Sequence, residues 1–227
     1  MKCAIMQPTY LPWAGYFNLI SQVDTFVFLD DAQYQKNSWH NRNRILLNKS
    51  VHWITVPVKK SSLNQTILTS SIDNTQPWRK KHIKKLQQTY AKSPFSGNVM
   101  EICQKLESTK VNNLAKLNIE MICWVMSKLD IDTKIMLASG MEITMQRTNT
   151  IIEILKILKA DTYISPLGSA DYLKEDDFIK KTTVELFFQD YASEPYHQYK
   201  ADIFTSHLSI VDVVANLGWS GAKQYVG

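Results

Sequence analysis

The chain opens with Met1-Lys-Cys-Ala-Ile-Met-Gln-Pro-Thr-Tyr-Leu-Pro-Trp-Ala-Gly-Tyr-Phe-Asn-Leu-Ile-Ser-Gln-Val-Asp-Thr-Phe-Val-Phe-Leu-Asp-Asp31, and this stretch decides the fold. Residues 3–6 are predicted to form a short buried strand, residues 13–22 a helix and residues 24–29 a second strand. Strand, loop, helix and strand in this order is the opening of an α/β fold.

The loop at 7–12 connects the first strand to the helix and cannot itself be helical. Each of its prolines lacks an N–H and biases the residue before it toward extended geometry. In α/β folds, loops at the carboxyl ends of strands carry the ligand site. We interpret the large side chains here as a binding wall for a base or a sugar, the alternative being an aromatic cluster that only locks the loop. They are Gln7, Tyr10, Trp13 and Tyr16.

The rest of the chain continues the α/β alternation around a helical stretch. Further strands are predicted at 133–138, 162–165 and 184–189, further helices at 148–158, 170–173 and 208–217, and a turn at 166–169. A hairpin at 42–47 and 52–58, a polar connector at 61–71 and helices at 74–92, 98–106 and 111–129 lie between. The prediction is a single α/β domain, 1–227, with a Rossmann-like, mostly parallel sheet and a helical insertion at about 74–130.

Composition narrows the class of protein. The 44% hydrophobic and 21% charged content is typical of a globular chain, and no apolar run approaches the roughly 20 residues that span a bilayer. The apolar stretch before Gln7 is too short for the hydrophobic region of a signal peptide, so we expect a cytoplasmic protein with no membrane insertion. The cysteines are odd in number and far apart, which favours free thiols and no metal site.

The net charge of +5 is mild and is concentrated at 79–85 and 59–60. A nucleic-acid binder usually carries a stronger basic excess on one face, so we favour a small anionic ligand and no nucleic acid. The basic helix face at 79–85 suits contact with an acidic carrier protein, or is simply solvated.

A candidate anion site lies in the first strand of the hairpin. Arg42 and Arg44 alternate along that strand and therefore share a face, where their guanidinium groups suit a pyrophosphate. The neighbouring amides Asn41 and Asn43 complete a polar run that we interpret as substrate-binding. The alternative is an exposed strand with solvated arginines.

Candidate acid–base groups lie at the second strand and on the first helix of the insertion. Asp30 and Asp31 end the strand and point to opposite faces, so one of them, Asp30 by preference, is a base or substrate anchor, and the alternative is a strand-end cap. His82 shares a helix face with Trp78 and Tyr90. It is either a core histidine or a partly buried base with a lowered pKa.

Several blocks of the chain resemble the WbqC-like family of bacteria. They are 7–17, Val23-Asp24 with Asp30-Asp31, Trp39-His-Asn-Arg-Asn-Arg-Ile45, Trp78-Arg-Lys-Lys-His82 with Tyr90, and Ser209-Ile-Val-Asp212 with Asn216-Leu-Gly218. The resemblance covers nearly the whole chain. It implies a role in O-antigen or other surface-polysaccharide biosynthesis, with Trp78 among the substrate-binding residues. The setting suggests acylation of an amino sugar.

A weaker resemblance, to nucleotidylyltransferases, concerns the same loop. Those enzymes begin a helix with His-x-Gly-His, and here Trp13-Ala-Gly-Tyr16 occupies that place without either histidine. The segment Ser165-Pro-Leu-Gly-Ser169 lies roughly where a later phosphate loop would be, with no adjacent Lys or Arg. The resemblance implies a shared fold, whereas imidazolium stabilisation of a pentavalent phosphate would be lost.

Taken with the resemblance, the residues predict an acyl- or aminoacyl-transferase that acts on the amine of a nucleotide-linked amino sugar. Its donor would be a thioester on coenzyme A or an acyl carrier protein, and no bound cofactor is predicted. His82 or Asp30 would be the base. A nucleotidyl-transfer-like enzyme, or its inactive nucleotide-binding descendant, is the second hypothesis, and a non-catalytic adaptor is the third.

Overall fold

The computed structural model describes residues 1–60 and 62–227, so that Ser61, the first residue of the expected connector at 61–71, lies outside the described part. A five-stranded parallel sheet runs through the molecule in the order β5-β2-β1-β6-β7. Its strands are β1 (Lys2–Met6), β2 (Thr25–Phe28), β5 (Lys134–Leu137), β6 (Thr162–Ser165) and β7 (Glu185–Phe188). The predicted Rossmann-like α/β class is confirmed.

The side chains of the central strands alternate between the two faces of the sheet. Ala4, Phe26 and Phe28 belong to one hydrophobic cluster, whereas Cys3 and Val27 belong to another. Successive strand residues point to opposite faces, so this division follows from the period of two. Both faces are buried, which is what a parallel sheet with crossover helices requires.

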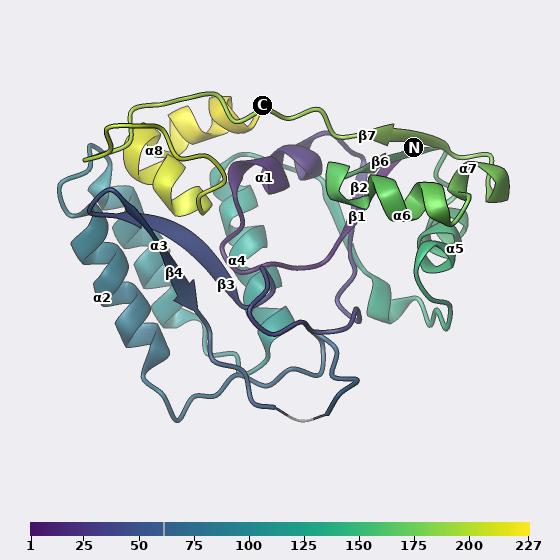
Figure 1. Ribbon diagram of the computed structural model, residues 1–227, viewed down its shortest axis with the longest axis horizontal. Helices are drawn as coiled ribbons and strands as arrows, with labels where there is room; N and C mark the ends of the chain where they lie inside the picture. The colour runs from purple at the N-terminus through teal and green to yellow at the C-terminus, as the bar shows by residue number, and fades with distance from the viewer. Residues whose placement is uncertain (61) are drawn as a thin grey trace.

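The two faces carry different helices. The first cluster is completed by α1 (Ala14–Ser21), α4 (Leu114–Lys128) and α8 (Ile210–Val226), and the second by α5 (Thr148–Leu158), α6 (Ala170–Glu175) and α7 (Phe178–Lys181). Figure 1 shows α5, α6 and α7 together at one side of the molecule, with α8 at the other. No helix within residues 1–60 and 62–227 is long and apolar enough to cross a membrane.

Between β2 and β5 the chain leaves the sheet. It forms the hairpin β3 (Arg42–Leu47) and β4 (Ser50–Thr55), then α2 (Trp78–Tyr90) and α3 (Ser96–Ser108), and returns through α4. Asn48 and Lys49 both have positive φ, 50° and 64°, as a two-residue hairpin turn of this twist requires. The segment expected to hold the helical insertion, at about 74–130, contains α2, α3 and α4.

The C-terminal helix differs from the prediction. The last helix was expected at 208–217, but α8 runs from Ile210 to Val226, with Gly218 in a non-helical conformation at φ 70°. A Cβ there would lie 2.7 Å from the ring of Phe95, so glycine permits both the bend and this close contact. The bend divides α8 into a first helical stretch before Gly218 and a short second stretch that ends at Val226.

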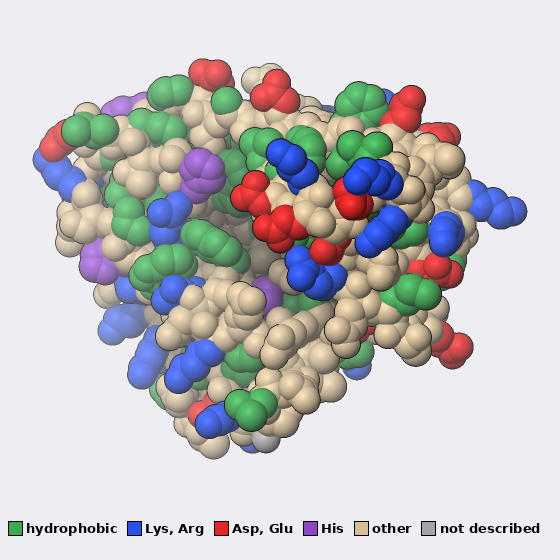
Figure 2. Space-filling model, turned by 45° about the vertical axis from the view of Figure 1, so that its right-hand side comes forward, with side chains coloured by type: hydrophobic (Ala, Val, Ile, Leu, Met, Phe, Trp, Pro, Cys, Tyr) green, Lys and Arg blue, Asp and Glu red, His purple; other side chains and the backbone are tan. Residues whose placement is uncertain are grey.

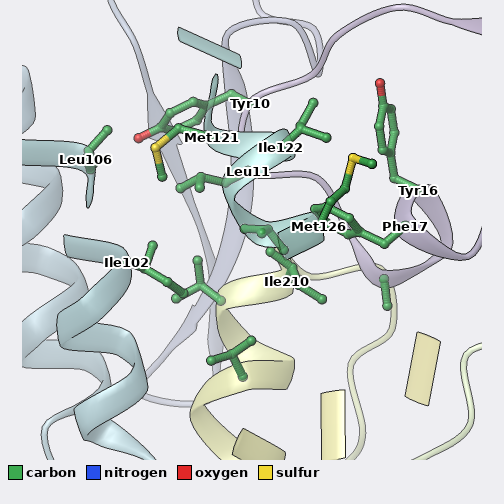
Figure 3. Close-up of a cluster of buried hydrophobic side chains, with 14 of the residues drawn as sticks. Tyr10, Leu11, Tyr16, Phe17, Ile102, Leu106, Met121, Ile122, Met126 and Ile210 are labelled. Atoms are coloured by element: carbon green, nitrogen blue, oxygen red, sulfur yellow. The ribbon is translucent and has the colours of Figure 1, made fainter. Parts of the chain in front are cut away.

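The loop at 7–12 is buried among helices from distant parts of the chain. Tyr10 and Leu11 are 0% and 1% exposed. Figure 3 shows them beside Met121 and Ile122 of α4, with side chains of α3 and α8 close by. The loop therefore forms part of the core on one side while its other side faces the carboxyl ends of the strands.

Candidate functional site

A cavity of about 530 Å³ lies at the carboxyl ends of β1 and β6. These neighbouring strands are the point at which the order of the sheet reverses, because β2 and β5 follow β1 on one side and β6 and β7 lie on the other. Ligands of open α/β sheets bind at such a switch point. Figure 2 shows the molecular surface hollowed near its centre, with hydrophobic side chains along the hollow.

The lining of this cavity is aromatic and uncharged apart from one histidine. No Asp, Glu, Lys or Arg is among the described residues that line it. Its polar and aromatic members come from the segment between β1 and α1, from α1 itself, from the turn after β6, from α6, and from the two ends of the segment at 189–209, which we call the strap. They are Gln7, Trp13, Tyr16, Ser169, Tyr172, Gln189, Tyr191 and His207.

Asparagine side chains hold the backbone of the loop at 7–12. Asn43 Nδ2 donates to the carbonyls of Tyr10 and Leu11, at 3.0 and 2.8 Å, and Asn118 Nδ2 donates to Pro8 O at 3.1 Å. Leu11 has φ 43°, which is costly for a side chain without hydrogen-bonding groups. The prolines prevent ladder or helix pairing here, so these amides satisfy the buried carbonyls and fix the loop.

Trp13, Tyr191 and His207 form what we call the outer cluster, at the cavity wall. The indole stacks on the imidazole with ring centroids 4.4 Å apart, and Tyr191 meets Trp13 edge-on at 5.5 Å. Gly15 lies under the indole, and a Cβ on it would lie 2.3 Å from two ring carbons. The glycine is therefore what lets Trp13 lie flat against the start of α1.

Tyr10, Trp78 and His82 form what we call the inner cluster, on the core side of the same loop. The Tyr10 hydroxyl lies 3.0 Å from His82 Nδ1, and Trp78 lies edge-on to the imidazole with centroids 5.3 Å apart. Burial lowers the pKa of His82 to about 4, against a backbone hydrogen bond with Thr55 that raises it. Its ring is neutral at pH 7, enclosed, and outside the cavity lining.

Gln7 reaches the cavity in an orientation set by His40. The Gln35 N–H donates to His40 Nδ1 at 3.3 Å, so the hydrogen of the neutral ring lies on Nε2, which contacts Gln7 Oε1 at 3.0 Å. Burial lowers the pKa of His40 to about 4 and keeps it neutral. With its oxygen engaged, the Gln7 amide presents its NH₂ group as a donor to a ligand.

The two aspartates after β2 take different positions. Asp30 is 1% exposed and accepts hydrogen bonds from the backbone and hydroxyl of Ser139, at 3.0 and 2.7 Å. It thereby ties the end of β2 to the short 3₁₀ helix after β5. Asp31 is half-buried, and burial raises its pKa, helped by the charge of Asp30. Neither lines the cavity.

The arginines of β3 lie on the outer face of the hairpin. Arg42 stacks over Trp53 at 4.0 Å, and Arg44 lies 5.4 Å from the ring of Trp39. Arg44 Nη2 also donates to the His207 carbonyl at 2.9 Å, which brings its charge to the rim of the cavity. Asn41 and Asn43 point inward instead, where Asn41 donates to Val56 O at 2.9 Å.

Of the residues predicted to bind substrate, the cavity gathers Gln7, Trp13 and Tyr16. Arg44 adjoins it through His207. Tyr10, Trp78 and His82 lie together on the opposite side of the loop. The remaining candidates are spread over the end of β2 and the hairpin, namely Asp30, Asp31, Asn41, Arg42 and Asn43.

Comparison with known proteins gives the family. The model of the WbqC-like protein family matches residues 7–224. The chain belongs to that family. It is 32% identical over 221 residues to "Uncharacterized protein Rv1507c" of Mycobacterium tuberculosis (strain ATCC 25618 / H37Rv), an alignment covering 96% of this chain and 94% of that protein. No solved structure gives a significant match.

The family match includes the strap, which supplies cavity residues that the sequence did not indicate. In the middle of the strap, Tyr196 donates to the buried carboxylate of Asp212 at 2.7 Å. Gln198 Nε2 and the Tyr90 hydroxyl donate to the same carboxylate, each at 3.0 Å. The middle of the strap is thus anchored to α8.

The ends of the strap reach the cavity through Tyr191 and His207. Neither has a spacing signal in the sequence, because both are isolated in an irregular segment. Tyr172 of α6 and Gln189 at the end of β7 also line the cavity and were not predicted to do so. Among the described residues, no group of His, Cys, Asp or Glu is arranged to hold a metal ion.

Proposed function

We propose that this protein binds a nucleotide-linked amino sugar in the switch-point cavity and transfers an acyl or aminoacyl group to its amine, in the synthesis of a surface polysaccharide. The observation that carries the proposal is the cavity itself, about 530 Å³ in volume, aromatic and uncharged, at the carboxyl ends of β1 and β6. Its volume lies within the range of small-molecule sites, roughly 300–1,000 Å³.

The lining suits the neutral part of such a ligand. Trp13 and Tyr172 line the cavity and offer aromatic surface that a base or a sugar ring can contact, and the Gln7 NH₂ group donates to a hydroxyl or carbonyl. A diphosphate would remain at the rim, where Arg44 adjoins His207. Arg42, on the same face of the hairpin, adds a second guanidinium for that group.

The outer cluster contains a group able to take a proton. Burial and the nearby charge of Arg44 lower the pKa of His207, so its ring is neutral at pH 7. Nδ1 lies 2.8 Å from Ser206 Oγ, and no described residue pairs with Nε2. This arrangement supports His207 as the base, whereas His82 and Asp30 have their polar atoms bound to neighbours inside the protein.

In the proposed reaction the sugar amine attacks the carbonyl carbon of a thioester on coenzyme A or a carrier protein. A C–N bond forms and the C–S bond breaks. The ammonium proton passes to His207 Nε2, and the departing thiolate takes a proton as it leaves. A neutral base is required, so turnover should rise with pH through the lowered pKa of His207.

The test begins with thermal stabilisation by nucleotide-linked sugars, with and without a free amine, alongside ATP, CTP and coenzyme A. A ligand that binds only the folded state raises the melting temperature. Stabilisation restricted to the amino-sugar nucleotides supports the proposal. Mass spectrometry then follows amide formation with acyl-thioester donors, and His207→Gln should lower turnover by about 10²-fold or more. Full turnover in that variant would reject His207 as the base.

Nucleotide binding with nucleotidyl transfer is the second candidate. The strand order and an N-terminus of α1 that lacks a side-chain cap beside the cavity favour it, because such termini attract phosphate. Stabilisation by ATP or CTP alone, with release of pyrophosphate, would select this reaction in place of acyl transfer.

A further inference from the structure

β7 is an open edge of the sheet. It pairs with β6 through alternate residues, as when Glu185 N donates to Asp161 O at 2.9 Å and Gln189 N to Ser165 O at 2.8 Å. The N–H and C=O groups of Leu186 and Phe188 therefore point away from β6. Across residues 1–60 and 62–227 nothing pairs with them. Figure 1 shows β7 on the outer rim of the molecule.

The same strand exposes large apolar side chains on both faces. Phe187 is 53% exposed and Phe188 is 38% exposed, and the two point to opposite sides of the sheet. On the side of Phe188 an apolar groove of about 540 Å³ runs between the strand and α7, lined by Leu186, Phe178 and Ile179, of which Ile179 is 76% exposed. An edge strand with exposed apolar residues is a template for pairing with another chain.

We propose that a second copy of this chain pairs with β7 in the antiparallel sense, about a two-fold axis at Phe187. The free groups fix this register. With Leu186 opposite Phe188 of the other copy, every outward N–H and C=O of these residues finds a partner. Phe187 then lies opposite its own copy at a position without hydrogen bonds, where the side chains approach most closely.

The occupant is a second copy because the edge is self-complementary. Lys180 and Lys181 precede the strand, whereas Asp190 and Glu194 follow it. Antiparallel pairing brings the lysines before β7 of one copy near the acidic residues after β7 of the other copy. The same contact is repeated on the other side of the two-fold axis, as an isologous interface requires. Directly opposed residues share a face, so Phe188 of the second copy enters the groove beside Leu186.

Cysteine cross-linking tests the register. Phe187→Cys places two thiols at the two-fold axis, with Cα atoms about 4.5 Å apart, within disulfide range. Mild oxidation should give a covalent dimer on a non-reducing gel. Glu185→Cys, on the same strand and face, lies opposite Gln189 and should stay monomeric on that gel. Cross-linking of Glu185→Cys without Phe187→Cys would overturn the proposed register.

Mass measurement tests the dimer. Light scattering after gel filtration should give twice the 26.2 kDa of the chain. Phe187→Lys opposes like charges at the axis and should raise the dissociation constant at least about tenfold. Leu137→Lys changes a 41% exposed residue on the other edge strand, β5, and should leave the dimer intact. A monomeric wild-type protein at roughly 100 µM, or dissociation by Leu137→Lys alone, would overturn the proposal.

Discussion

The inner and outer clusters contain the same residue types, Tyr, Trp and His, on opposite sides of one loop. The inner cluster, Tyr10, Trp78 and His82, is at most 6% exposed, and its imidazole is bound by a hydroxyl and a backbone group. The outer cluster lines a cavity, and no residue within 1–60 and 62–227 hydrogen-bonds to Nε2 of its imidazole. Residue type therefore does not set the role of these two clusters. The inner cluster is enclosed and belongs to the core. The outer cluster borders a cavity and is therefore accessible to a ligand.

The largest expected effect separates the clusters by stability. Tyr10→Ala removes a fully buried ring and should lower the free energy of unfolding by about 3–5 kcal/mol. Trp13→Ala removes a ring that borders a cavity, and should cost about 1–2 kcal/mol. Urea unfolding measures both. If Trp13→Ala lowers the free energy of unfolding as much as Tyr10→Ala does, the outer cluster belongs to the core.

The inner histidine should make stability depend on pH. In the folded state burial lowers the pKa of His82 from its ordinary 6.5 to about 4, so the folded form resists protonation. The contribution of the neutral ring to the free energy of unfolding is complete above pH 6.5. It falls by on the order of 3 kcal/mol as the pH drops toward 4. His40 contributes in the same window.

His82→Gln makes this test specific because it removes the imidazole of the inner cluster and leaves His40 in place. The variant should lose less stability than wild type between pH 7 and pH 4, whatever its stability at pH 7. Urea midpoints at both pH values give the comparison. An unchanged pH dependence would mean that His82 is not held neutral by the fold.

A smaller effect concerns only the outer cluster. Gly15→Ala puts a methyl group where the Trp13 indole lies, and the displaced ring should weaken binding of the best ligand from the thermal panel by about tenfold. Gly97→Ala is the matched control, since a Cβ at that helix position meets nothing within 4 Å. It should leave affinity unchanged and stabilise the helix by about 0.5–1 kcal/mol. Equal affinities in the two variants would separate Trp13 from the site.

The smallest expected effect comes from single hydroxyl groups. Tyr10→Phe removes the hydroxyl that lies beside His82 Nδ1 and should lower the free energy of unfolding by about 1–2 kcal/mol. Tyr16→Phe frees the carbonyl of Gln7 at the cavity, where water replaces the lost bond at 2.9 Å, so its cost should be lower. Thermal unfolding of the two variants gives the order, and the reverse order would contradict the assignment of inner and outer sides.

Much of the fold follows from the sequence because its signals are local. The short apolar runs at 3–6 and 24–29 and the apolar helical segment at 111–129 predicted elements close to β1, β2 and α4. The end of the last helix was misplaced, because Gly218 supplies a bend and close packing on Phe95 as well as a break. A glycine in a sequence does not distinguish these roles.

The site was only partly predictable, because it depends on which way a loop faces. The strand-loop-helix pattern located Gln7, Trp13 and Tyr16 at the cavity. The pattern did not predict that Tyr10 points into the core instead. Its carbonyl accepts a hydrogen bond from the buried Asn43 side chain. His207 comes from the far end of the chain, and its place depends on the long-range contact with Arg44. No local pattern encodes such a contact.

Ligand binding in Trp13→Ala and Tyr10→Phe shows most directly which side of the loop at 7–12 holds the ligand. The measurement is the rise in melting temperature on adding the amino-sugar nucleotide that stabilises wild type most. We expect Trp13→Ala to lose that rise, whereas the less stable Tyr10→Phe keeps it in full. Retention in Trp13→Ala together with loss in Tyr10→Phe would contradict the claim that the outer side of the loop holds the site.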